Sequence, residues 1–214
     1  LLANVLLDEV DKELERRGHC LVRYADDANV YVRSRKAGER VMALLRKMYA
    51  KLHLTVNETK SAVASAFGRK FLGFSFWEAP KGKIKCGVAT KPLAAYKQRI
   101  RQLTRRSDGR SMAEVVEKLR AYVLGWKAYF RLSQTPRVWQ ALDEWMRHRL
   151  RAIQLKHWKR GPTMCRELKA LGAPEIVARR VAGNSHSWWR NSYRLINSIL
   201  TIAYFDRLGV PRLL

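Results

Sequence analysis

The pattern of the sequence changes at Thr90-Lys91-Pro92. Before this point, short runs rich in β-branched and aromatic residues stand between helical segments, which is typical of antiparallel strands. Beyond it, strand signals fade and apolar residues recur mainly at helical spacing. The sequence therefore predicts an α+β fold, in which an antiparallel sheet with helices on one face is followed by an all-helical part.

The first part of the chain is expected to combine two helices with several short strands. A helix over 2–17 is expected to end at Gly18, and a second amphipathic helix covers 36–52. Strands are expected at 20–24, 28–32, 54–56, 61–66, 71–77 and 83–89. In the second part, Ser111 and Glu114 form a capping box. Helices are expected there at about 92–105, 111–131, 136–158, 162–171, 174–182 and 191–206.

The charge of the chain indicates the class of its partner. Its 214 residues include 43 Lys and Arg against 18 Asp and Glu, a formal net charge of +25. Residues 91–214 alone hold 26 basic and 8 acidic side chains. Such an excess favours a polyanion, with an anionic membrane surface as the alternative. No apolar run approaches the ~20 residues that span a bilayer, and three scattered cysteines indicate a reducing compartment.

Residues 24–27 read Tyr24-Ala25-Asp26-Asp27 and lie between the β-prone runs 20–24 and 28–32. Two such runs joined by a tight Asp-rich turn are typical of a β-hairpin. Adjacent carboxylates at a hairpin tip repel each other, and Mg²⁺ would reverse that penalty because hard cations prefer carboxylate oxygens. Polymerases use such sites with two metal ions. We predict Asp26 as the main metal ligand, with Asp27 assisting it or capping the turn; a solvated Asp-Asp turn is the alternative.

Two further segments carry candidate chemistry. Asn57-Glu58-Thr59-Lys60 follows a predicted strand, and Lys60 is a candidate proton donor to a leaving pyrophosphate; an ordinary polar turn is the alternative. In Phe71-Leu72-Gly73-Phe74, a glycine within a strand permits close backbone approach, either by a primer end or by a packed neighbour. Three acids of the first helix are expected to be solvated, namely Asp8, Glu9 and Asp11.

The second part of the chain interleaves aromatic and basic side chains. Tyr122, Trp126, Tyr129 and Phe130 lie close to helical spacing, for which core packing is the alternative to ligand binding. RNA is bound largely through phosphates, stacking on aromatic or arginine planes, and 2′-hydroxyl groups. The predicted RNA contacts are Arg120, Lys127, Arg131, Arg147, Arg149, Arg151, Lys159 and Arg160.

Together these segments resemble the C-terminal half of a group II intron-encoded protein, a reverse transcriptase with maturase activity. Leu1-Leu2-Ala3-Asn4 resembles the helix after the family's Pro-Gln-Gly-rich palm segment. Tyr24-Ala25-Asp26-Asp27 is similar to the palm metal motif, and Asn57-Glu58-Thr59-Lys60-Ser61 to the motif that holds the palm lysine. Phe71–Phe74 resembles the primer grip, and Leu124-Gly125-Trp126-Lys127-Ala128-Tyr129-Phe130 the signature of the maturase-specific thumb.

The resemblance implies domains and roles. Residues 1–90 would be the C-terminal part of the palm, 91–170 the maturase-specific helical domain, and 171–214 a basic helical tail. Asp26 and Asp27 would hold Mg²⁺, Lys60 would assist phosphoryl transfer, and Phe71, Leu72, Gly73 and Phe74 would hold the primer terminus. The implied partners are intron RNA, an RNA/DNA template–primer and deoxynucleoside triphosphates, with no membrane and with a homodimer as an option. The implied location is a bacterial cytoplasm, with nucleoid association, or an organelle.

The chain also departs from the family pattern. The fingers and the first palm segment, with the family's other metal-binding aspartate, would precede Leu1, so the isolated chain is expected to lack a complete active site. Residues 161–214 hold too few cysteines and histidines for the zinc-containing endonuclease domain of some relatives. Two alternatives stay open: an RNA-binding splicing factor without polymerase activity, and a non-functional gene fragment.

Overall fold

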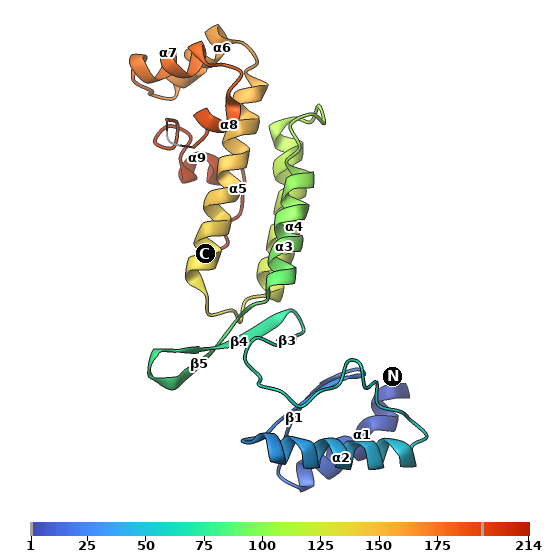
Figure 1. Cartoon of the computed structure of the whole chain (residues 1–214). Helices are drawn as coiled ribbons and strands as arrows, with labels where there is room; N and C mark the ends of the chain where they lie inside the picture. Colours follow the sequence, from blue (N-terminus) through green and yellow to red (C-terminus); the bar gives the residue numbers. More distant parts are fainter. Residues whose placement is uncertain (1, 194) are drawn as a thin grey trace. The chain divides into compact units, whose positions relative to one another are not determined.

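The computed structural model describes residues 2–193 and 195–214 and divides the chain into two compact units, Leu1–Arg69 and Lys70–Leu214 (Figure 1). The predicted boundaries after residues 90 and 170 both fall inside the second unit. Helices are combined with small antiparallel sheets, as the α+β prediction requires. The predicted single sheet is replaced by two separate ones, β1-β2 and β3-β4-β5. In the described residues, no helix is long and apolar enough to cross a membrane.

The first unit is a hairpin packed with two helices. Its elements are α1 (Leu2–Arg16), β1 (Cys20–Tyr24), β2 (Asp27–Tyr31) and α2 (Arg35–Lys51). Gly18, at φ 74°, ends α1 in the left-handed conformation that glycine adopts without a Cβ clash. Ser34 begins α2, because its side chain accepts a hydrogen bond from the Ala37 N–H. The buried apolar side chains are Leu7, Val10, Leu14 and Val41.

The strands predicted at 54–56 and 61–66 are wrong, since the chain is irregular in both segments. The reason is visible at Gly38 in α2, where an added Cβ would lie 2.5 Å from the Val63 side chain. The segment therefore packs its alternating apolar residues onto a helix rather than beside a partner strand. Extended backbone alone does not make a sheet, because each strand needs a neighbour for its N–H and C=O groups.

The second unit begins with a three-stranded antiparallel sheet of β3 (Lys70–Phe71), β4 (Phe74–Ala79) and β5 (Lys83–Val88). The short η1 turn (Pro80–Gly82) joins β4 to β5. The predicted strand over 71–77 is split, because Leu72 and Gly73 form a two-residue turn with Phe71 paired to Phe74. Both turn residues have positive φ, 50° and 80°, as tight hairpin turns of this length require.

Helices make up the rest of the second unit. The long ones are α3 (Thr90–Leu103), α4 (Met112–Tyr129) and α5 (Pro136–His157), and Figure 1 shows them side by side. Four shorter helices follow: α6 (Gly161–Ala170), α7 (Glu175–Gly183), α8 (Trp188–Asn191) and α9 (Ile202–Arg207).

The helix predicted over 191–206 is wrong apart from its two ends, and Arg194 within that range lies outside the described residues. Local side-chain bonds explain the interruption. The Asn191 side chain donates to the Asn184 carbonyl (2.9 Å), and the Ser192 hydroxyl donates to the Trp189 carbonyl (2.7 Å). Such bonds compete with continued helix.

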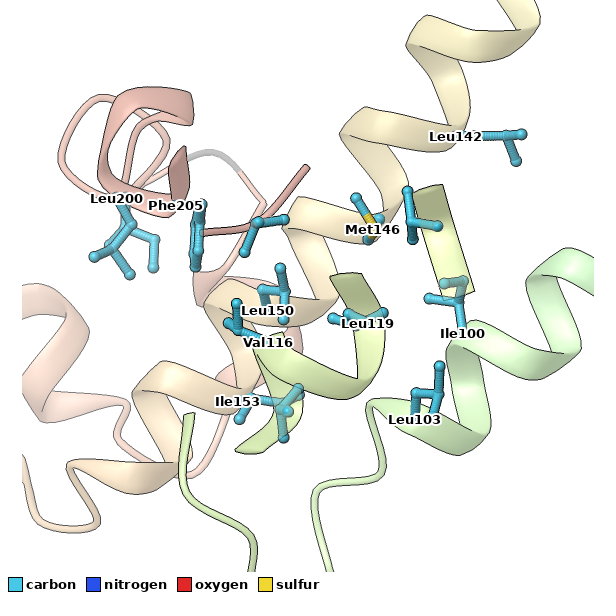
Figure 2. Close-up of a cluster of buried hydrophobic side chains, with 14 of the residues drawn as sticks. Ile100, Leu103, Val116, Leu119, Leu142, Met146, Leu150, Ile153, Leu200 and Phe205 are labelled. Carbon is cyan, nitrogen blue, oxygen red and sulfur yellow. The ribbon is translucent and has the colours of Figure 1, made fainter. Parts of the chain in front are cut away.

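One hydrophobic core extends through the second unit. Figure 2 shows side chains from α3, α4, α5 and the C-terminal segment meeting between the helices, among them Ile100, Leu119, Met146 and Phe205, which are fully buried. Further along the chain, Leu213 is 3% exposed. Residues of the predicted basic helical tail, 171–214, therefore contribute to the same core as the long helices.

Candidate functional site

The acidic pair lies at the tip of the β1-β2 hairpin. Tyr24 pairs with Asp27, so Ala25 and Asp26 form a two-residue loop, with Ala25 at φ 54°. Both aspartates are exposed. Arg23 of β1 stabilises the loop, since its Nη1 donates a hydrogen bond to the Ala25 carbonyl at 2.9 Å. The hairpin therefore presents two adjacent carboxylates on a braced turn.

Arg23 also corrects the prediction of an entirely solvated acidic face on α1. Its Nε donates to both carboxylate oxygens of Asp11, at 3.0 and 2.8 Å, and this ion pair is partly buried. Because Asp11 hydrogen-bonds it, the pKa of the Arg23 guanidinium is raised further. Asp11 thus holds the hairpin to α1, whereas Asp8 and Glu9 are exposed as predicted.

The carboxylates of Asp26 and Asp27 suit a divalent cation. Within the described residues, neither carboxylate has an ion pair or a side-chain hydrogen bond. Carboxylate oxygens are the ligands that Mg²⁺ prefers. The described residues contain no group of three or more His, Cys, Asp or Glu side chains that could hold a metal ion. The hairpin therefore offers two ligands of a site, and further ligands would have to come from elsewhere.

Lys60 lies in an exposed turn of the same unit. The Asn57 Oδ1 accepts hydrogen bonds from the backbone N–H groups of Thr59 (3.2 Å) and Lys60 (3.3 Å), which fixes the turn. Glu58 accepts two hydrogen bonds from Arg46 in α2, at 2.9 and 2.8 Å, and this pairing lowers the pKa of the Glu58 carboxyl. The turn is therefore anchored to α2 and leaves the Lys60 ammonium group in solvent.

The predicted primer-grip residues and the predicted thumb signature are brought together in the second unit. The rings of Phe74 and Phe130 lie 5.2 Å apart, and the Tyr129 hydroxyl donates to the Leu72 carbonyl at 3.1 Å. A Cβ on Gly73 would stand 3.2 Å from the Phe130 ring. Of the two interpretations of this glycine, the packed neighbour is therefore observed, at a turn rather than inside a strand.

The aromatic residues of α4 belong mainly to the core. The Trp126 ring lies 4.5 Å from Tyr96, 4.7 Å from Phe130 and 5.1 Å from Trp139, measured between ring centroids. Such tilted and edge-on contacts are the preferred packing of aromatic rings. The core alternative is therefore correct for Trp126 and Phe130, while Tyr129 is exposed.

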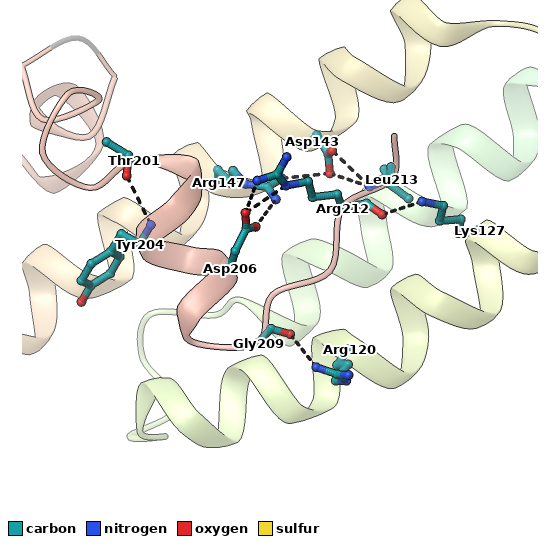
Figure 3. Close-up of polar contacts among 10 residues, drawn as sticks. All are labelled: Arg120, Lys127, Asp143, Arg147, Thr201, Tyr204, Asp206, Gly209, Arg212 and Leu213. Atoms are coloured by element: carbon teal, nitrogen blue, oxygen red, sulfur yellow. Dashed lines mark hydrogen bonds and ion pairs between the residues drawn. The ribbon is translucent and has the colours of Figure 1, made fainter.

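Two of the predicted RNA contacts are buried instead. Arg147 is 2% exposed and forms ion pairs with Asp143 (3.0 Å) and Asp206 (3.4 Å), as Figure 3 shows. Arg151 is 8% exposed and donates to the Leu200 carbonyl at 2.9 Å. Burial, reinforced by the charge of Arg147, lowers the pKa of Arg151 to about 10. Both arginines join α5 to the C-terminal segment, where a phosphate cannot reach them.

Three other predicted contacts bind the protein's own backbone. Arg149 donates to the Thr104 hydroxyl (2.6 Å) and carbonyl (3.2 Å) at the end of α3. Arg120 and Lys127 donate to the carbonyls of Gly209 (3.3 Å) and Arg212 (3.0 Å), seen in Figure 3.

The remaining predicted contacts, Arg131, Lys159 and Arg160, are exposed. A second set of exposed or half-exposed cations, which was not predicted, lies around the α3–α4 connection: Arg99, Arg105, Arg110 and Lys118. Their spacing on two successive helices flanking Ser107-Asp108-Gly109 was the available signal.

Two family models match the chain. Residues 1–76 match the model of reverse transcriptases (RNA-dependent DNA polymerases), and residues 93–171 match the model of the group II intron maturase-specific domain. The first match includes the acidic hairpin, the Lys60 turn and the Gly73 turn, and the second includes α4 with its aromatic signature. No curated protein matches the chain.

Proposed function

The chain belongs to the reverse transcriptases encoded by group II introns, which are also maturases, and from this membership we propose a role for each of its two units. The first unit contributes palm residues to RNA-directed DNA synthesis. The second contributes the primer grip and a helical thumb that contacts intron RNA and the template–primer. The observation that carries the proposal is the pair of exposed carboxylates on the braced β1-β2 hairpin, which have no ion pair within the described residues.

In this proposal, Asp26 and Asp27 hold Mg²⁺, which would supply electrostatic stabilisation of the charge that develops at the reacting phosphate. Lys60 donates a proton to the pyrophosphate that leaves the incoming deoxynucleoside triphosphate. The Lys60 ammonium group is free for that task because its turn is fixed by Asn57 and by the Arg46–Glu58 pair rather than by Lys60 itself.

The primer grip is proposed to work by rigidity. Leu72 and Gly73 form a turn that is locked on both sides, since the Gly73 carbonyl accepts from the Ala89 N–H (2.8 Å) and the Leu72 carbonyl accepts from Tyr129 (3.1 Å). A turn held to α4 in this way would present the primer end beside the C-terminal part of α4, which contains most of the thumb signature.

The test is an Asp26→Asn exchange in the complete open reading frame that contains this chain, assayed for Mg²⁺-dependent primer extension. Extension should fall by at least about 100-fold, because a metal ligand is lost. Binding of intron RNA should stay within a factor of about two, since the proposed RNA surfaces lie in the other unit. Asp8→Asn, an exposed carboxylate on α1, is the matched control and should keep full activity. Unimpaired extension by the Asp26→Asn protein would refute the metal assignment.

A second candidate is a splicing factor that binds RNA without polymerising DNA. The observation that favours it is that the described residues supply only two ligands of a metal site, whereas residues 91–214 carry 26 basic side chains. It predicts intron splicing that is unaffected by both aspartate variants and no extension by the unaltered protein. A non-functional fragment predicts neither splicing nor salt-dependent RNA binding.

The setting of this activity is also proposed. The protein would act in a bacterial cytoplasm, associated with the nucleoid when it acts on DNA, or in an organelle. Self-association as a homodimer is tested by sedimentation of the purified protein with and without RNA. A single species of monomer mass under both conditions would exclude the dimer.

A further inference from the structure

We propose that the groove between α3 and α4 binds the phosphate backbone of an RNA strand, an inference that rests on the proposed RNA-binding function. The groove has a volume of about 680 Å³ and is formed by the outer faces of the two helices and their connection. Its lining residues are Arg99, Gln102, Leu103, Arg105, Asp108, Arg110, Lys118, Ala121 and Tyr122.

The charge of the groove is strongly positive. Four lining side chains are cationic and one is anionic. The single carboxylate, Asp108, pairs with Arg110 at 3.2 Å. Within the described residues, Arg99, Arg105 and Lys118 have no ion pair, and all three are exposed. Three unneutralised cations that face one groove create a positive potential that suits a chain of phosphates.

Two hydrogen bonds orient charged side chains in and beside the groove. Glu114, one turn before Lys118 on α4, is held by the Ser111 N–H at 2.7 Å within the capping box, and this bond lowers the pKa of its carboxyl. Arg99 donates from Nη1 to the Gln102 Oε1 at 3.2 Å, a neutral partner that orients the guanidinium and leaves its charge intact. Glu114 is therefore oriented toward its own helix terminus and forms no ion pair with the groove cations in the described residues, although its charge acts on Lys118 and Arg110 at longer range.

The walls of the groove are preorganised. Leu103 is buried, and Tyr122 packs its ring on Tyr96 with 5.8 Å between centroids. Arg149 of α5 ties the end of α3 by donating to the Thr104 hydroxyl and carbonyl. A ligand would therefore meet cations on fixed helices, and less conformational entropy would be lost on binding.

The chemistry of the groove favours an RNA strand over a membrane. Arginine forms forked hydrogen bonds to phosphate oxygens, and the Gln102 amide can bond a 2′-hydroxyl group. Strong binding to a lipid surface combines charge with exposed apolar side chains that insert between headgroups. None of the exposed large apolar side chains in the described residues lines this groove.

The experiment compares two triple variants of the 214-residue chain. The groove variant is Arg99→Gln/Arg105→Gln/Lys118→Gln. The control variant, Arg137→Gln/Arg180→Gln/Arg207→Gln, removes the same charge from exposed positions of the same unit outside the groove. Binding of a fluorescein-labelled single-stranded RNA of mixed sequence is followed by fluorescence anisotropy over a range of KCl concentrations.

The groove variant should bind RNA about 10- to 100-fold more weakly, and its log–log salt slope should fall by about 2, since three phosphate contacts at about 0.7 each are lost. The control variant should change affinity by less than about threefold. Equal losses in both variants, with normal binding by the unaltered chain, would overturn the groove assignment alone. Flat salt dependence in the unaltered chain would instead overturn the proposed RNA-binding function.

Two further measurements complete the test. Vesicles of phosphatidylserine and phosphatidylcholine are offered to both variants, and selective loss of vesicle binding with unchanged RNA binding would replace the RNA assignment by a membrane one. Lys118 acetylation is read by mass spectrometry in the unaltered chain, which needs no variant to fold. RNA should protect Lys118 from acetylation several-fold more than it protects Lys169 on α6. Equal protection of the two lysines by RNA would contradict the inference.

Discussion

Gly73 meets two requirements at once. Its φ of 80° lies in the left-handed region, and a Cβ would approach the Phe130 ring to 3.2 Å and Pro92 to 3.4 Å. We expect Gly73→Ala to destabilise the protein by about 2–5 kcal/mol, combining left-handed strain of about 1–2 kcal/mol with overpacking of about 1–3 kcal/mol. Urea unfolding of the second unit, followed by tryptophan fluorescence, measures this loss.

Gly172 provides the matched control for that experiment. It has φ 85° and no neighbouring atom within 4 Å of a Cβ, so Gly172→Ala carries the backbone strain without the clash. The Gly73 variant should therefore lose about 1–3 kcal/mol more than the Gly172 variant, which is the contribution of overpacking alone. Equal losses would show that Phe130 yields to the added methyl group and that packing does not require a glycine at the turn.

His148 gives the protein a dependence on pH. Its ring stacks on Trp189 at 3.7 Å, and Nε2–H donates to the Trp189 carbonyl at 3.0 Å. Burial lowers the pKa of His148 below 6.5, assisted by the charges of Arg151 and Arg149. The unfolded state therefore binds more protons, so this stabilisation is complete above about pH 6.5 and is lost as the pH falls below it.

We expect His148→Phe, which keeps a stacking ring but cannot titrate, to flatten the decline of stability between pH 7 and pH 5. Urea midpoints measured across that range test the difference, and His157, whose pKa is also lowered by burial, is common to both proteins. Parallel midpoint curves for the two proteins would show that His148 does not contribute to the acid dependence.

The residues also show what a sequence can predict. The acidic hairpin was predicted correctly, because turn chemistry and strand alternation are local properties. The charge of Arg147 and Arg151 predicts RNA contacts, because charge is visible in the sequence while burial is not. Their partners, Asp206 and Leu200, lie about fifty residues or more along the chain. The groove cations were not predicted, because the spacing of the sequence indicates exposed charges on two successive helices, while only helix packing brings Arg99 and Lys118 to one groove.

Among the elements, the C-terminal segment after α9 behaves as part of the core. The Leu213 N–H donates to the Asp143 carboxylate at 3.2 and 3.1 Å, and its side chain is 3% exposed (Figure 3). We expect Leu213→Ala to cost about 2–4 kcal/mol, because the methyl groups of a buried leucine are lost from a packed site. The adjacent Leu214, 59% exposed, is the control and should change stability by less than about 0.5 kcal/mol.

The free energy of unfolding of both leucine variants is measured by chemical denaturation. Because both substitutions are Leu→Ala, any difference between them reflects the burial of the side chain. Equal effects would mean that the segment does not hold its place on α4 and α5 in solution. A large loss at Leu213 alone would show that the segment stays packed against α4 and α5 in solution.

The elements that were predicted correctly share a physical cause. Helices α3 to α7 follow from amphipathic spacing and from local caps such as Ser111–Glu114, none of which depends on distant residues. The strands at 54–56 and 61–66 failed because strand formation needs a partner, and the segment packed Val63 against Gly38 instead. Residues 71–77 were predicted as one strand because a single glycine was the only turn signal inside this apolar run. The structure instead has a hairpin turn at Leu72 and Gly73.

For the molecule as a whole, the two units differ in the size of their cores. The core of the first unit is built on Leu7, Val10, Leu14 and Val41 with partly buried neighbours. The core of the second runs from Val88 through the long helices to Leu213. Local opening costs less where fewer apolar contacts are broken. The proposed metal-binding carboxylates would therefore lie on the less stable unit, and the proposed RNA groove on the more stable one.

Hydrogen–deuterium exchange of the whole chain tests this difference. Amides of α1 and α2 should exchange at least about tenfold faster than those of α4 and α5. Leu14→Ala, which removes a fully buried side chain from the smaller core, should accelerate exchange in α1 and α2 and leave α4 and α5 within about twofold of the unaltered chain. Accelerated exchange throughout α4 and α5 would mean that the chain opens as one cooperative body. In that case a destabilising mutation would reduce polymerase and RNA-binding activities together. If the two units open independently, core variants of the first unit should retain their affinity for RNA.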